Sequence, residues 1–188
     1  MAERWGWRQG EASRLGWRQF GWRQLSWRRL TGTLVWVVLL AFMFAHVEIE
    51  IEGAAGWAAS LPTWRIEHHW LLDLLWGGRA MTGYHAWVFS FMFLFFHFPM
   101  VASSNYAWRA EAHALGCIML FWIVEDFLWF VLNPAYGLAR FDPVHVLWHK
   151  RWLLHAPIEY WLFLPVAAVL LFTGTQSGDP RCRPAREK

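Results

Sequence analysis

The 188-residue chain has little charge and little cysteine for its size. Asp, Glu, Lys and Arg make up 16% of its residues, against about a quarter in an ordinary soluble domain. Because a water-facing surface must be covered by polar groups and a lipid-facing surface need not be, this deficit argues against a soluble protein. The two cysteines, Cys117 and Cys182, are too few for a disulfide framework. Cys117 falls within an apolar segment, where a free cysteine is usually a small core residue.

Several motifs are also missing. The chain has no nucleotide-binding loop, no Gly-x-Ser-x-Gly turn and no nucleic-acid-binding motif, so we expect no nucleic-acid partner. A cleavable signal peptide is not evident either. The basic region before the first apolar run is about 30 residues long, which is longer than the basic start of a usual signal peptide. We therefore expect the first apolar run to be retained as a membrane span.

Apolar and aromatic residues are abundant: 57% of the chain is hydrophobic, with 17 Trp and 15 Phe. Tryptophan settles at membrane–water interfaces, because its ring is apolar and carries one donor. Roughly 20 residues of helix cross the hydrocarbon core of a bilayer. The apolar runs therefore predict an all-α integral membrane protein, a bundle of four transmembrane helices. The expected spans cover about residues 31–51, 84–103, 110–132 and 152–173.

The basic residues predict the orientation of the bundle. With both termini on one side, that side holds twelve of the 17 Lys and Arg residues and the opposite loops hold five. The five are Arg65, Arg79, Arg140, Lys150 and Arg151. Since cytoplasmic loops carry the excess of Lys and Arg, we expect both termini in the cytoplasm. The composition and compact loops further suggest a bacterial inner membrane.

The membrane domain is expected over residues 31–174, between basic tails at 1–30 and 175–188. The first tail repeats Gly-Trp-Arg-Gln, a unit too short to be a packing module. Two interpretations of this tail stay open. Its Trp and Arg residues suit an anchor at lipid headgroups, whereas its low complexity suits a disordered tail or an upstream start-codon artefact.

The two outer loops are expected to be structured. In the first loop, the apolar stretch from Trp70 to Trp76 is too short to span and predicts a surface or re-entrant segment. In the second loop, Asp142-Pro143 is typical of a helix start. It predicts a short amphipathic helix with His145 and His149 on one face. Pro157 and Pro165 are expected to kink or restart the fourth span.

Carboxylates and imidazoles gather at the predicted outer side, and Glu125-Asp126 is the most informative pair. Both lie within a long apolar run, where an ionised carboxylate facing lipid is costly. They must therefore face the bundle, be protonated or bind a cation. Neighbouring helical residues are about 100° apart, so we expect one of the two to be the main inward-facing group. The alternative is a carboxylate that pairs with Arg or Trp to fix helix packing.

Other residues in this region have the spacing of metal ligands. His145 and His149 are four apart, as are His155 and Glu159 at the start of the fourth span. Such pairs share a helix face, although the spacing also occurs by chance. Three acids, Glu48, Glu50 and Glu52, close the first span. Only Glu48 and Glu52 would share a face in a helix, and a hydrated helix end is the alternative. His85 is a single candidate at the mouth of the second span.

These residues predict a site that binds a metal or handles protons near the outer leaflet. Mixed carboxylate and imidazole ligands suit iron, manganese or zinc, and apolar walls suit a hydrophobic substrate. We expect Glu125 and Asp126 as catalytic groups. The expected metal ligands are Glu52, His85, Glu125, His145, His149 and Glu159.

The second hypothesis is a non-catalytic small subunit or assembly factor of a larger membrane complex, and transport, haem binding and sensing also stay open. Many Trp and Phe side chains offer surfaces for contact with other subunits or with a second copy. Two known families were weighed and set aside. Membrane desaturases use His-x-x-His-His boxes, and none is present. Stacked-haem cytochromes need same-face histidines, whereas His85 and His97 are roughly 120° out of line. One haem held by single histidines from two helices stays open.

Overall fold

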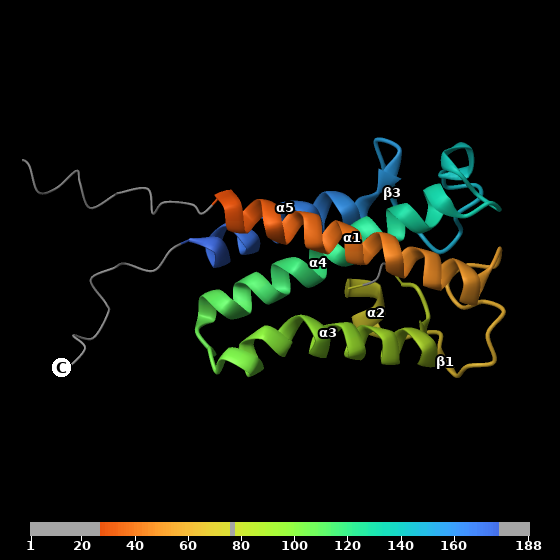
Figure 1. The fold of residues 1–188 in the computed structure, drawn as a ribbon. Helices are drawn as coiled ribbons and strands as arrows, with labels where there is room; N and C mark the ends of the chain where they lie inside the picture. The colour runs from red at the N-terminus through yellow and green to blue at the C-terminus, as the bar shows by residue number, and fades with distance from the viewer. Residues whose placement is uncertain (1–26, 76–77, 177–188) are drawn as a thin grey trace, which may run out of the picture.

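The computed structural model describes residues 27–75 and 78–176, which form a bundle of four long helices (Figure 1). The long helices are α1 (Trp27–Glu52), α3 (Gly83–Ser103), α4 (Trp108–Leu132) and α5 (Ile158–Thr175). All four are long and apolar enough to cross a membrane. Even the shortest, with 18 residues, is about 27 Å long. The predicted four-helix membrane bundle is confirmed.

Six short elements lie in the two loops that join the long helices at one end of the bundle. The elements are β1 (Arg65–Ile66), α2 (Trp70–Leu75), β2 (Met81–Thr82), the 3-10 helix η1 (Leu138–Arg140), β3 (Trp152–Leu153) and β4 (Ala156–Pro157). Strand β1 pairs antiparallel with β2, and β3 pairs antiparallel with β4. We call the end of the bundle that carries these two loops the distal end. The start of α1, the end of α5 and the turn between α3 and α4 lie at the opposite, proximal end (Figure 1).

Helix α4 is the centre of the bundle and packs against α1, α3 and α5. Its closest neighbour is α5, and glycines make this approach possible. A Cβ added to Gly116 would lie 2.9 Å from the backbone nitrogen of Leu171, and one added to Gly174 would lie 2.6 Å from the Cβ of His113. Small residues at such crossings let the backbones of membrane helices come close. The α4–α5 pair is therefore a tight unit onto which α1 and α3 pack.

The apolar side chains divide between a packed interior and an outward surface. The largest fully buried side chains include Phe121 and Phe130 of α4. Leu94, Phe98 and Val169 are about two-thirds exposed on the outside of the bundle. Such a surface suits contact with lipid tails, because these side chains gain nothing from facing water. This arrangement matches the low charge of the sequence.

The loops differ from the prediction in one place and agree in another. Helix α2 is the expected short, non-spanning segment of the first loop. The amphipathic helix predicted over Asp142–His149 is wrong, because this stretch forms turns. The Asp142 carboxylate accepts hydrogen bonds from the backbone N–H groups of Val144 and His145, and Val146 is fully buried. Packing of the loop against α4 therefore outweighs the helical propensity of a short segment.

The fourth helix begins at Ile158, later than the predicted start near residue 152. Residues Trp152–Pro157 instead form the β3–β4 hairpin. Leu154 and His155 turn this hairpin with positive φ angles of 47° and 63°. Pro157 directly precedes α5. Proline suits a helix start, because it has no N–H to donate and its φ angle is fixed near the helical value. The tails expected at 1–30 and 175–188 lie mostly outside the described residues, and residues 27–30 already belong to α1.

Candidate functional site

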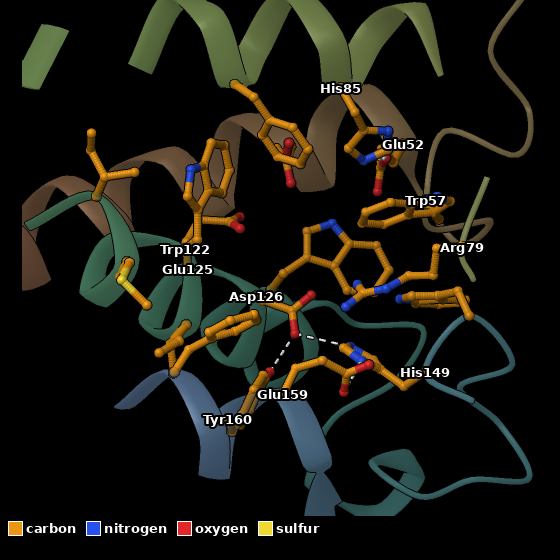
Figure 2. A pocket seen from close by; sticks show the side chains of 18 of the residues that line it. Glu52, Trp57, Arg79, His85, Trp122, Glu125, Asp126, His149, Glu159 and Tyr160 are labelled. Atoms are coloured by element: carbon orange, nitrogen blue, oxygen red, sulfur yellow. Dashed lines mark hydrogen bonds and ion pairs between the residues drawn. The ribbon is translucent and has the colours of Figure 1, made fainter. Parts of the chain in front are cut away.

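A cavity of about 430 Å³ lies in the distal half of the bundle, and we call it the distal pocket (Figure 2). All four long helices and both distal loops contribute to its walls. Its polar lining consists of Glu48, Glu52, Arg79, His85, Glu125, Asp126, His149, Glu159 and Tyr160. These side chains come from segments far apart in the sequence, so the fold gathers them in one place.

Helix α1 supplies two of the acids. Glu48 and Glu52 are one helical turn apart and both are buried, at 7% and 5% exposed. Glu50, which lies between them, is exposed. The acidic run is helical, because α1 continues to Glu52, and the buried pair contradicts the alternative of a hydrated helix end for Glu48 and Glu52. The helix places one pair of carboxylates inside the pocket and leaves the third outside.

Helix α4 supplies two further acids from adjacent positions. Glu125 is 2% exposed and lies against Glu48 of α1, while Asp126 points toward His149 and Tyr160 (Figure 2). We expected one of the pair to dominate, but both line the pocket. The reason is the central position of α4. Neighbours cover it on several sides, so two directions about 100° apart can both point inward.

One group of side chains surrounds His85, and we call it the His85 cluster. The imidazole is 4% exposed and stacks on Trp57 with ring centroids 3.9 Å apart. Its Nδ1 lies 2.7 Å from Thr82 Oγ1, and its Nε2 lies 3.8 Å from Glu52 Oε1. That carboxylate oxygen also accepts the backbone N–H of Ala58 at 2.5 Å. The first distal loop therefore holds His85 and Glu52 together.

A second group, the His149 cluster, lies across the pocket. His149 Nε2 is 3.0 Å from Asp126 Oδ2, and the Tyr160 hydroxyl donates to the same oxygen. On its other side, His149 Nδ1 is 3.8 Å from Glu159 Oε2. Neither Nδ1 nor Oε2 has a hydrogen-bond partner, although both atoms are buried. Glu125 Oε1 is a third buried atom without a partner in the same pocket.

The charges in the pocket are unbalanced. Five carboxylates line it, and among the described residues Arg79 is the one Lys or Arg that does so. Arg79 also lies over the Trp57 ring, 4.6 Å from its centroid. Placing several ionised carboxylates in an apolar environment is costly unless cations accompany them. The pocket must therefore take up positive charge, either as protons or as a metal ion.

The remaining lining of the pocket is apolar. Phe89 and Phe93 of α3, Ile118 and Met119 of α4, and Phe163 of α5 form this part. Along each helix, these residues lie about one to two turns further from the distal end than a polar lining residue of that helix, which is His85 in α3, Glu125 in α4 and Glu159 in α5. The carboxylates and histidines therefore lie toward the loops, where Trp57, Trp129 and Trp148 also line the pocket, and the lining toward the middle of the bundle is apolar. This arrangement suits an amphipathic molecule.

The structure brings together most of the predicted site residues. Glu52, His85, Glu125, Asp126, His149 and Glu159 all line the distal pocket. His145 does not. It lies in the exposed loop with its Nδ1 2.8 Å from Asp142 Oδ2, and this hydrogen bond holds the pKa of Asp142 below its usual 3.8. Among the described residues, no three His, Cys, Asp or Glu side chains already surround one point as metal ligands would.

Sequence reasoning missed three contributors to the site. Arg79 and Trp57 belong to the first distal loop, whose path has no signal in the sequence. Tyr160 could have been found, because it directly follows Glu159. Two neighbouring residues at a buried helix start can both face a central pocket, and the Tyr160 hydroxyl does contact Asp126. Comparison with known proteins adds nothing to these assignments, since no family model, curated protein or solved structure matches the chain.

Proposed function

We propose that the distal pocket is the divalent-metal site of a membrane-embedded enzyme that acts on a hydrophobic substrate. The observation that supports this most strongly is the pair of buried atoms His149 Nδ1 and Glu159 Oε2, neither of which has a hydrogen-bond partner. They lie 3.8 Å apart, which is too far for a hydrogen bond. Two donors bound at about 2.1 Å to one ion lie no more than about 4.2 Å apart. The gap is therefore suited to a shared cation.

The tautomer of His149 supports the same conclusion. An ionised carboxylate can only accept hydrogen bonds, so the Nε2 atom that faces Asp126 at 3.0 Å carries the ring proton. This leaves a lone pair on Nδ1, directed at the Glu159 carboxylate. Two lone pairs that face each other repel unless a cation lies between them. A carboxylate behind a histidine is also the usual support of a metal-binding imidazole.

The His85 cluster offers a second position for a cation. His85 Nε2 and Glu52 Oε1 are also 3.8 Å apart, and Glu125 Oε1 is buried without a partner. Oxygen and imidazole donors of this kind suit iron, manganese or zinc. A bound ion would act as a Lewis acid or lower the pKa of a bound water. Glu125 and the adjacent Asp126, whose Oδ2 belongs to the His149 cluster, are the proposed catalytic carboxylates.

The apolar half of the pocket indicates the class of substrate. A molecule with its reactive group at the carboxylates would place its apolar part against Phe89, Phe93 and Phe163. Because these residues lie in spans, a lipid or another hydrophobic molecule could reach them from the bilayer. With the distal end facing outward, as the basic residues predict, the chemistry would take place near the outer leaflet of the membrane.

Metal analysis of the purified full chain tests this proposal. The protein is expected to contain iron, manganese or zinc in stoichiometric amount, and His149→Gln and Glu159→Gln variants are expected to lose it. Two matched controls keep the residue types but lie outside the pocket: His145→Gln in the same loop and Glu50→Gln, whose side chain is exposed on α1. A metal-free protein that purifies with fixed partner proteins would instead support the role of a non-catalytic subunit.

A site that handles protons is the second candidate, and one contact favours it. The carboxyl groups of Glu48 and Glu125 lie against each other, and the Tyr84 hydroxyl donates to Glu48 Oε1 at 3.0 Å. Two carboxyl groups in contact can share one proton without a metal. Infrared spectroscopy distinguishes the two cases. A protonated-carboxyl band that disappears in Glu125→Gln, in protein without metal, would favour protons as the cations of the pocket.

A further inference from the structure

A second, larger cavity of about 830 Å³ lies at the proximal end, away from the carboxylates, and we call it the proximal pocket. Its polar rim includes three arginines: Arg28 and Arg29 from the first turn of α1, and Arg109 from the first turn of α4. These residues are distant in sequence, so the bundle itself gathers three positive charges around one opening.

No carboxylate neutralises these arginines within the part of the chain that the structure describes. None of the ion pairs there includes Arg28, Arg29 or Arg109. Arg109 contacts a neutral group, the backbone carbonyl of Gln176, at 3.5 Å. The nearest acid along α4, Glu111, lies 3.2 Å from His97 Nε2. Among the described residues, the rim therefore has a surplus of positive charge and is suited to an anion.

Further features inside the pocket suit the same ligand. His113 Nδ1 is buried without a hydrogen-bond partner, and the Nε2 of this residue lies 3.4 Å from the hydroxyl of Thr33. Both residues line the pocket, so a hydroxyl and an imidazole are added to the guanidinium groups. Gly32 lines it too, and a Cβ placed there would meet no atom within 4 Å. The glycine leaves open space beside the basic rim.

Part of the pocket lining is apolar and lies on the outer surface of the bundle. It includes Trp36 of α1 and Phe95 and Phe98 of α3, which belong to helices long and apolar enough to span a membrane. A free inorganic anion would gain nothing from these aromatic side chains. A phosphate joined to a hydrocarbon chain would use both parts of the pocket, since apolar burial and charge attraction add.

We infer that the proximal pocket binds an anionic phospholipid, with the headgroup phosphate at Arg28, Arg29 and Arg109 and an acyl chain along Trp36 and Phe95. The site is separate from the distal pocket and does not depend on the function proposed for it. The phosphate contacts hold the first turns of α1 and α4 together, so the lipid acts as a structural ligand of the bundle.

Native mass spectrometry of the full chain in detergent tests the inference, with phosphatidylglycerol, phosphatidylcholine and inorganic phosphate as probes. Phosphatidylglycerol is expected to bind more tightly than the other two. The triple variant Arg28→Gln/Arg29→Gln/Arg109→Gln is expected to bind it about tenfold to a hundredfold more weakly, because each basic residue near a membrane surface adds to the attraction. Inorganic phosphate that competes as well as the lipid would reduce the site to an anion site and overturn the inference.

A matched control removes the same charge at the other end. The triple variant Arg140→Gln/Lys150→Gln/Arg151→Gln changes three exposed distal residues and is expected to leave lipid binding unchanged. An equal loss in both triple variants would mean general charge attraction and would contradict a defined site. Gly32→Trp fills the open space without changing charge, and it is expected to weaken lipid binding while the metal content stays at the wild-type value.

Discussion

The Nε2 atom of His149 lies 3.0 Å from Oδ2 of Asp126, which fixes the imidazole so that its Nδ1 faces Glu159. One residue of this pair comes from a loop and the other from the central helix α4. The contact therefore joins the distal loop to the bundle and sets the orientation of the ring. If His149 is a metal ligand, Asp126 is the residue that holds it in place.

This relationship predicts the effect of Asp126→Asn. The variant keeps the size of the side chain but removes the charge behind the imidazole, and an amide can face the ring in the wrong orientation. Loss of such a supporting group typically lowers metal affinity about 10–100-fold. Titration of the metal-free protein with zinc or manganese measures the change. The Glu50→Gln variant is the control, and equal affinities of Asp126→Asn and wild type would show that the contact does not support a ligand.

Helix packing gives a prediction that is independent of any ligand. Gly116→Ala places a methyl group 2.9 Å from the backbone of α5, and overpacking of this kind costs about 1–3 kcal/mol. A lower thermal midpoint in detergent, followed by Trp fluorescence, is expected. Gly32→Ala is the matched control, because nothing lies within 4 Å of its added Cβ. A midpoint that falls equally in both variants would contradict a tight α4–α5 contact.

The exposed loop provides a test of pH dependence. The hydrogen bond from His145 lowers the pKa of Asp142 below 3.8, so the contact contributes stability above that pH and loses it as pH falls through the lower, folded-state pKa. His145→Gln is expected to raise the pKa of Asp142 toward 3.8. A carboxyl NMR titration measures this shift. Because His145 lies outside the distal pocket, metal content at neutral pH should not change.

Labelling of single cysteines tests the orientation that the basic residues predict. In a background with Cys117→Ala and Cys182→Ala, a Ser60→Cys variant places a thiol on the first distal loop and Ser104→Cys places one in the α3–α4 turn. In intact bacterial cells, an impermeant maleimide is expected to label position 60 directly and position 104 only after permeabilisation. The reverse pattern would put the distal pocket on the cytoplasmic side.

The spans and much of the site could be predicted because the cost of burying charge in a membrane is large. Ionised side chains within an apolar run must avoid lipid, so Glu125 and Asp126 could be singled out from the sequence, although only one of them was expected to dominate. For the acids of α1, helical spacing predicted that Glu48 and Glu52 share a face, but the sequence left a hydrated helix end open. These inferences depend on hydropathy and helix geometry, which are local properties of the chain.

The distal loops could not be predicted, since their paths depend on packing between distant residues. His145 and His149 have the spacing of a shared helix face, yet the segment forms turns that direct one outward and one inward. Burial of Val146 and stacking of Trp148 on Phe130 decide this path. Arg79 also reaches the pocket because of the path of its loop. The local sequence pattern indicates neither the position of Arg79 nor that of His149.

The most direct test of the proposed function is the position of a bound ion. Crystals of the full chain grown with manganese or zinc would give an anomalous diffraction peak at the metal. The peak is expected between Nδ1 of His149 and Oε2 of Glu159, about 2.0–2.2 Å from each, with Nε2 of His149 still facing Asp126. Binding at the exposed His145–Asp142 pair instead, or a distal pocket without a peak at saturating metal, would contradict the proposal.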